Sequence, residues 1–290
     1  MNTVQWLIIG ITAVLILIAL YYLLCKRNID STWERDITPR SVLGIIKIFQ
    51  ALNSVPRLRE LRINQRESPK VYLGSPEEVS MTYDEIVEWA GIPFGSLPYK
   101  VMDNLGNKLG DLSENGTCVF INKLITENPT SFLATLCREL SRKVLLCCGL
   151  STEANDPAFV DVTCAYLGFS TLMLNSRYDV CDIYISTDKG VKLSLIPPGI
   201  VQIDRYESRF IPVGVFPTPL VAVLNLLSVG MGYGPKKECS KLSAQSKAAV
   251  AQMRKVLKKM GLVLIRGEAM SQTEWLAINE TACCRAISGI

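Results

Sequence analysis

The residues of this chain with the clearest chemical potential lie in the stretch 136–142, which reads Leu-Cys-Arg-Glu-Leu-Ser-Arg. Arg138 and Arg142 are separated by one helical turn, and Glu139 follows the first of them. A guanidinium group stays protonated and has no free lone pair, so it donates hydrogen bonds but cannot ligate a metal ion. The pattern therefore places two permanent cations on one helix face, and neither of them can serve as a metal ligand.

The chain contains no histidine and ten cysteines. Without histidine it lacks the commonest metal ligand and the usual proton shuttle near neutral pH, so histidine-dependent triads and zinc sites are excluded as self-contained chemistry. Thiolate and carboxylate groups could still form a metal site, with ligands drawn from Cys137, Cys147, Cys148, Cys164, Glu139 and Asp161. A cysteine nucleophile would lack a histidine base.

Two helices must position these side chains. Asn128 and Pro129 are typical of a helix start, and we expect this first helix to cover 129–148 and to end at Gly149. Its apolar residues recur at helical spacing. A second helix, predicted at 157–174, carries Asp161 and is apolar over much of its surface, so it should be buried. A short apolar strand is predicted before them at 118–122.

The remaining pattern predicts a helix-rich α+β domain with a small β component. Further helices are expected at 41–52, 82–90, 219–229, 243–260 and 273–282, the second of them capped by Thr82. Strands are expected at 70–73 and 262–265, and a hairpin at 180–186 and 191–196. The segment 91–116 is rich in Gly, Pro and Asn, which predicts turns and a hairpin near residues 104–107.

The helix at 129–148 resembles the active-site helix of zincin metalloproteases, which carries the pattern His-Glu-x-x-His. In that family the two histidines bind one zinc ion and the glutamate activates its bound water. Arg138 and Arg142 stand at the histidine positions, and Glu139 stands at the glutamate. The resemblance therefore implies a metalloprotease-like domain that has lost its zinc ligands, with Glu139 as a vestigial catalytic residue and no bound metal or cofactor.

The second helix extends this resemblance. The run from Asp161 to Phe169 is similar to a segment of uncharacterised bacterial membrane-anchored zincin-like proteins, in which acidic residues of this helix complete the metal site. The resemblance matches Asp161 and Ala158 to those acidic positions and implies a zincin-like core at about 118–230. If the resemblance holds, Arg138 and Arg142 take over the electrostatic role of the metal, neutralising Glu139 and Asp161 and bonding to them. Under the alternative interpretation, Glu139 simply pairs with Lys143 on an exposed helix face.

A hydrophobic run that begins at Val4 and ends at Cys25 predicts one transmembrane helix. It carries no charge, and about twenty residues suffice to cross a hydrocarbon core of roughly 30 Å. Lys26, Arg27 and Arg35 follow it, and positively charged flanks stay in the cytoplasm. We therefore expect an anchor at 1–25, a juxtamembrane linker at 26–40 and a cytoplasmic globular domain at 41–290.

Three functions are compatible with these features. The first is a membrane-anchored, catalytically inactive metalloprotease-like protein that acts in binding or regulation, with an unknown protein partner. The second is an active enzyme with a Cys/Asp/Glu metal site, and the third is a scaffold that docks a membrane partner through the anchor or the apolar segment 219–229. The net charge of +4 is modest, and no basic stripe interleaved with aromatic residues indicates nucleic-acid binding.

Overall fold

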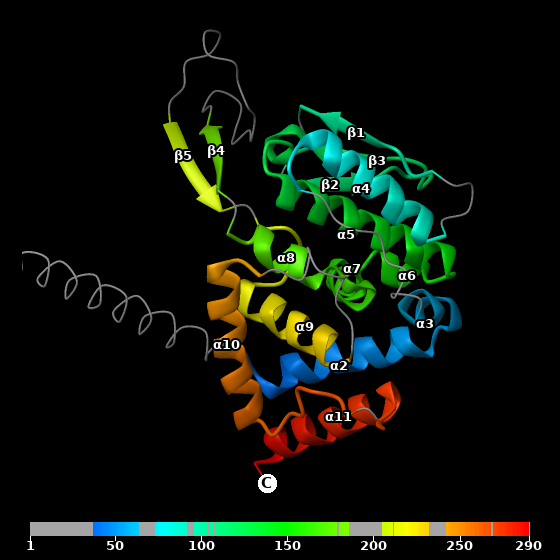
Figure 1. The fold of residues 1–290 in the computed structure, drawn as a ribbon, viewed down its shortest axis with the longest axis vertical. Coiled ribbons are helices and arrows are strands. Elements are labelled where there is room, and N and C mark those ends of the chain that lie inside the picture. The colour runs from blue at the N-terminus through cyan, green and yellow to red at the C-terminus, as the bar shows by residue number, and fades with distance from the viewer. Residues whose placement is uncertain are drawn as a thin grey trace, which may run out of the picture.

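The computed structural model describes residues 37–63, 73–91, 96–103, 105–106, 108–178, 180–185, 205–210, 212–231, 242–267 and 269–289. Four predictions fall wholly or mostly outside these residues: the anchor at 1–25, the linker at 26–40, the strand at 70–73 and the strand at 191–196. The described part is mainly helical with two small sheets, so the α+β class is confirmed (Figure 1).

The central element is α5 (Pro129–Cys147), which carries the two arginines. Asn128 occupies the N-cap position with an extended backbone, and Pro129 is the first helical residue. After the helix, Gly149 adopts a positive φ of 77°, which glycine tolerates without a steric penalty. The predicted helix at 129–148 is therefore confirmed almost to the residue.

A three-stranded sheet packs against α5. Its middle strand is β3 (Val119–Asn122), which pairs in parallel with β1 (Tyr99–Met102) and antiparallel with β2 (Gly110–Leu112). The strand predicted at 118–122 is confirmed, whereas the hairpin predicted near 104–107 is wrong because β1 and β2 are not neighbours. The reversal joins β2 to β3 instead, where the Ser113 hydroxyl accepts hydrogen bonds from the amides of Thr117 and Cys118, both at 3.0 Å.

The helix predicted at 157–174 is buried, as expected, but it is not continuous. It consists of α7 (Pro157–Cys164), a π-helical turn η3 (Ala165–Phe169) and α8 (Ser170–Ser176), and it bends at Gly168, whose φ is 102°. Among the described residues, 157–176 is the segment long and apolar enough to cross a membrane, yet 83% of its most apolar window is buried inside the protein. We therefore assign it to the core.

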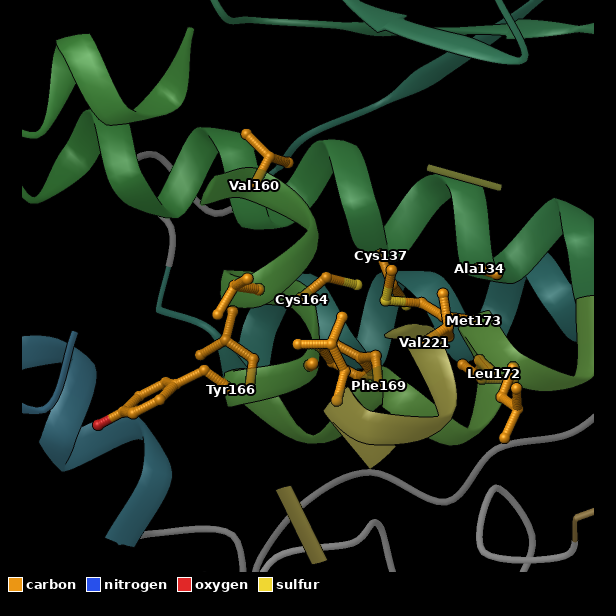
Figure 2. Close-up of a cluster of buried hydrophobic side chains, with 14 of the residues drawn as sticks. Ala134, Cys137, Val160, Cys164, Tyr166, Phe169, Leu172, Met173 and Val221 are labelled. Carbon is orange, nitrogen blue, oxygen red and sulfur yellow. The ribbon is translucent and has the colours of Figure 1, made fainter. Parts of the chain in front are cut away.

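Figure 2 shows how this bent segment fills the interior. Tyr166 reaches α2 (Pro39–Ser54), where its ring centroid lies 5.9 Å from that of Phe49. Its hydroxyl donates a hydrogen bond to Asn53 Oδ1 at 3.3 Å. Phe169 meets Trp89 edge to face. The segment thus fixes α7, which carries Asp161, against the rest of the core.

A second helical group surrounds this core. It includes α9 (Thr218–Gly230), α10 (Ala244–Lys259), α11 (Gln272–Ser288) and α3 (Pro56–Ile63). The helices predicted at 41–52, 219–229, 243–260 and 273–282 are confirmed as α2, α9, α10 and α11. Most of α9 is buried, and Val229 is its exposed large apolar residue, so the docking of a partner at 219–229 stays a prediction.

Two local predictions are wrong. Thr82 is not a helix cap: α4 (Pro76–Trp89) begins earlier, after Ser75, whose hydroxyl accepts a hydrogen bond from the Glu78 amide. The segment 262–265 is not a strand, because Asn279 bonds to both the N–H and the carbonyl of Val263. The strand predicted at 180–186 is confirmed as β4 (Val180–Ile185), which pairs antiparallel with β5 (Arg205–Phe210). Its predicted pairing with 191–196 lies outside the described residues.

Candidate functional site: a buried arginine between two carboxylates

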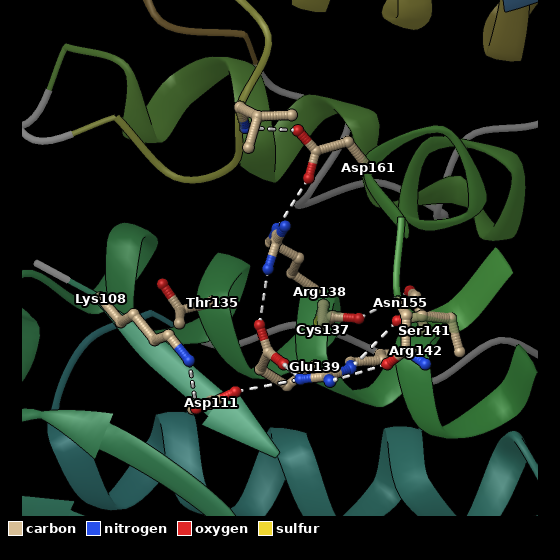
Figure 3. Close-up of polar contacts among 12 residues, drawn as sticks. Lys108, Asp111, Thr135, Cys137, Arg138, Glu139, Ser141, Arg142, Asn155 and Asp161 are labelled. Carbon is tan, nitrogen blue, oxygen red and sulfur yellow. Dashed lines mark hydrogen bonds and ion pairs between the residues drawn. The ribbon is translucent and has the colours of Figure 1, made fainter. Parts of the chain in front are cut away.

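Arg138 lies at the centre of a polar cluster between α5 and α7 (Figure 3). Its Nε donates a hydrogen bond to Asp161 Oδ1 at 2.7 Å, and its Nη1 donates one to Glu139 Oε1, also at 2.7 Å. The side chains of Arg138, Glu139 and Asp161 are 16%, 2% and 0% exposed. One guanidinium therefore bridges two buried carboxylates, which agrees with the hypothesis drawn from the resemblance for this residue.

Burial and charge act in opposite directions on this group. Burial by itself lowers the pKa of Arg138, but Glu139 and Asp161 raise it by more, so the net shift is upward. Arg138 therefore remains a fixed cation. Charge-assisted hydrogen bonds of this length are among the stronger interactions in proteins, and they offset the cost of burying the three charges.

The second oxygen of Asp161 is held by the loop before α9. Asp161 Oδ2 accepts hydrogen bonds from the backbone N–H of Val215 at 2.7 Å and of Phe216 at 3.4 Å. Gly214 makes this approach possible: its φ is 86°, and a Cβ at that position would collide with the carboxylate. Both oxygens of Asp161 are thus engaged within the protein.

Arg142 takes a different set of partners from Arg138. Its Nη1 donates to Asp111 Oδ1 on β2 at 3.0 Å, and its Nε donates to the carbonyl of Ala154 at 3.0 Å. It approaches Glu139 only to 3.9 Å. The expectation that both arginines neutralise Glu139 and Asp161 is therefore correct for Arg138, whereas Arg142 mainly pairs with Asp111.

Glu139 is the least satisfied member of the cluster. Its Oε2 is buried and, among the described residues, has no hydrogen-bond partner. Burial raises the pKa of Glu139 by more than the two arginines lower it. The alternative pairing with Lys143 on an exposed face is wrong, because Glu139 points into the protein and bonds to Arg138.

A cavity of about 390 Å³ opens beside this cluster. Its wall combines charged groups with apolar ones, the charged groups being Lys108, Asp111, Arg138, Glu139 and Arg142. The loop 212–215 and Val160 supply much of the apolar wall. Concave sites that combine apolar walls with a few polar groups are typical of ligand binding.

The structure brings together Arg138, Glu139, Arg142 and Asp161, but not Ala158. Ala158 lies in the first turn of α7, where its amide donates to the capping carboxylate of Asp156, and it is not among the residues that line the cavity. Asp161 is not itself a lining residue, but it bonds to two residues that are, Arg138 and Val215. The match of Ala158 to an acidic metal-site position thus has no counterpart in this cluster.

The sequence interpretation missed Asp111 and the loop 214–216. Asp111 was assigned to turns, yet it lies on β2, where Lys108 Nζ at 2.6 Å and Arg142 hold it. Burial alone would raise its pKa, but these two cations outweigh burial and lower it. The amides of Val215 and Phe216 bond to Asp161 from more than fifty positions away, so no local pattern indicated them.

The cysteines of the described residues do not assemble into a metal site. Within the described parts of the chain, no group of three or more Cys, Asp or Glu side chains is close enough to hold a metal ion. Cys137 and Cys164 are fully buried, and burial raises the pKa of Cys164 to about 12. A thiol with that pKa remains protonated near neutral pH, so it is a poor ligand and a poor nucleophile.

Comparison of the chain with protein-family models, with curated proteins and with solved structures finds no match in any of the three.

Proposed function

We propose that this chain is a membrane-anchored protein whose globular domain is a catalytically inactive relative of zincin metalloproteases and acts by binding or regulation. The observation that carries the proposal is the position of the Arg138 guanidinium, which bonds to Glu139 and to Asp161 at 2.7 Å each. These are the two carboxylates that the resemblance assigns to the vestigial zinc site.

The chemistry of the cluster argues against hydrolysis through this site. Zinc hydrolases need a metal with an open position for water, and a carboxylate free to accept a proton from that water. Here Arg138 places a permanent positive charge between the carboxylates, which would repel a metal ion. Glu139 already accepts a hydrogen bond from Arg138 through one oxygen, and its other oxygen is shielded from solvent.

Binding remains possible after catalysis is lost. The cavity beside Arg138 and Arg142 retains charged and apolar walls, and its volume of about 390 Å³ suits a small ligand or one side chain of a partner. An inactive domain with such a cavity would act by binding or presenting a ligand rather than by cleaving it.

Zinc affinity tests the proposal. In Arg138→His/Arg142→His, two imidazoles would stand one turn apart beside Glu139, and we expect weak zinc binding and no peptidase activity, because a zinc site usually needs a third protein ligand. Adding Ala158→Glu should tighten zinc binding if the second helix is matched correctly. The same triple variant with Ala158→Gln keeps the size of the side chain but removes its charge, and it is the matched control.

Isothermal titration with zinc of the purified full-length variants and parent gives the result. If Arg138→His/Arg142→His/Ala158→Glu binds zinc no better than the parent, these three positions do not share a site and the zincin relationship loses its support. A stoichiometric zinc ion in the parent, bound at this cluster, would contradict the inactive assignment directly.

A further inference from the structure

The positive charge of this chain is concentrated in one segment. Residues 235–266 contain nine Lys and Arg residues and one Glu, a net charge of +8, whereas the whole chain carries +4. The rest of the chain therefore carries a net charge of −4. An asymmetry of this kind in a modestly charged protein indicates a surface that attracts anions.

The described part of this segment is dominated by α10, which contains no acidic residue. Its Lys247, Arg254, Lys255 and Lys258 are exposed, on the face opposite the buried Met253 and the other apolar residues of the helix. Within the described residues, none of these four cations forms a salt bridge with a carboxylate. The face thus presents a row of cations that the described fold leaves without neutralising partners.

We propose that this basic face of α10, defined by Lys247, Arg254, Lys255 and Lys258, docks the domain on an anionic phospholipid surface. The proposal goes beyond the function proposed above and uses only its predicted anchor. Cys25 ends the predicted transmembrane run, and Ile37 begins the described domain about twelve residues later, which a fully extended chain spans in at most about 40 Å. The domain would therefore stay within one domain diameter of the bilayer.

Charge complementarity identifies an anionic lipid surface as the binding partner of this basic face. The cytoplasmic leaflet carries a negative surface potential, and each Lys or Arg near it contributes about 1 kcal/mol of attraction. Tethering by the anchor would raise the effective concentration of α10 at that surface, so several moderate attractions suffice. Single-stranded nucleic acid usually also needs aromatic side chains on which bases stack, and α10 has none.

Lysine acetylation of the full-length chain in nanodiscs tests this docking. Pure phosphatidylcholine discs are compared with discs that contain one quarter phosphatidylserine, and modification is followed by mass spectrometry. We expect Lys247, Lys255 and Lys258 to react at least about fivefold more slowly in the anionic discs, the factor that corresponds to about 1 kcal/mol. Lys100 on β1 should react equally in both, and 0.5 M salt should remove the difference through screening.

Two double variants with the same change in net charge provide the control. Lys255→Glu/Lys258→Glu should abolish the protection of Lys247, whereas Lys100→Glu/Lys123→Glu should leave it intact. Equal reactivity of the α10 lysines in the two kinds of disc overturns the proposal. If these lysines also react more slowly than Lys100 in both discs, the protection indicates a protein contact. Protection by added duplex DNA in neutral discs as strong as that by phosphatidylserine would also overturn it.

The anchor is reported separately by co-elution with pure phosphatidylcholine discs. A chain that co-elutes only with anionic discs would contradict the anchor but support the docking of α10. A chain that inserts into both discs without protection of α10 would support the anchor but contradict the docking of α10.

Discussion

Arg138 is partly buried and Arg177 is buried, and both are attracted by Asp161, but their hydrogen-bond partners differ. Arg138 bonds to two carboxylates, and its pKa is raised. Arg177, at the end of α8, is only 6% exposed, and its Nε and Nη2 have no hydrogen-bond partner among the described residues. Burial lowers its pKa to about 10, although Asp161 acts in the other direction.

The pKa values of the two arginines therefore differ because only Arg138 has carboxylates at hydrogen-bond distance to offset the effect of burial. Asp161 accepts from Arg138 on one oxygen and from Val215 and Phe216 on the other, so its nearest positions are already occupied. Arg177 receives only a longer-range attraction. We therefore expect removal of the two arginines to have opposite effects on stability.

Removal of Arg138 should have the largest effect. Arg138→Met leaves Glu139 and Asp161 buried without their cation, and breaking one side of a buried pair typically costs about 3–5 kcal/mol. Urea unfolding of the purified chain measures this cost.

Arg142→Ala is the matched comparison for Arg138→Met. Its partner Asp111 is 29% exposed, so the expected loss is about 1 kcal/mol. A loss of less than about 1 kcal/mol for Arg138→Met, or equal losses for both variants, would show that Arg138 is not the centre of the cluster.

Gly214→Ala should disturb the other side of Asp161. The added Cβ would collide with the carboxylate, and φ of 86° is unfavourable for alanine, so we expect a loss of about 2–4 kcal/mol. Gly149→Ala is the control, because Gly149 also has a positive φ, 77°, but nothing lies within 4 Å of its added Cβ. If thermal unfolding shows the same loss for both variants, the contact of Gly214 with Asp161 contributes nothing beyond backbone strain.

Arg177→Met should act in the opposite direction to Arg138→Met. Methionine fills a similar volume without burying unpaired donors, so the free energy of unfolding should rise by about 1 kcal/mol. Chemical denaturation of the two methionine variants side by side gives the comparison. A loss of 2 kcal/mol or more on replacing Arg177 would mean that its guanidinium is satisfied after all.

The pH dependence of Glu139 should be the smallest effect. Its pKa in the folded protein is raised above the ordinary value of 4.5, so the folded state holds this proton more tightly than the unfolded chain. Stability should therefore fall as pH rises from about 4.5 through the folded pKa. Glu139→Gln removes this dependence, while Asp111, present in both proteins, cancels in the difference. The free energy of unfolding is measured against pH for parent and variant. A constant difference between the two from pH 4.5 to 7.5 would refute the shift.

The sequence predicted the parts of this structure that depend on local pattern. The apolar stripe and the flanking Asn128 and Gly149 were sufficient to locate α5, and the one-turn spacing placed both arginines on it. The contact of Arg138 with Asp161 was expected only from the resemblance to zincins, which matched both residues to one vestigial metal site.

Contacts between distant segments could not be predicted in this way. β2 is only three residues long and is formed by its pairing with β3, so nothing local distinguished it from the surrounding turns. Arg142 pairs with a different carboxylate from Arg138 because Asp111 lies within its reach on that strand. The bend at Gly168 interrupts a helix that its apolar composition would favour as continuous.

The coupling between Arg138 and Asp161 tests the central claim, that a guanidinium is the cation of this buried cluster. A double-mutant cycle with Arg138→Met, Asp161→Asn and the combined variant isolates the interaction from the cost of each change. We predict a coupling free energy of about 2–3 kcal/mol, as expected for a buried pair with direct hydrogen bonds. A coupling below about 0.5 kcal/mol would mean that the two side chains contribute independently, and it would contradict the account.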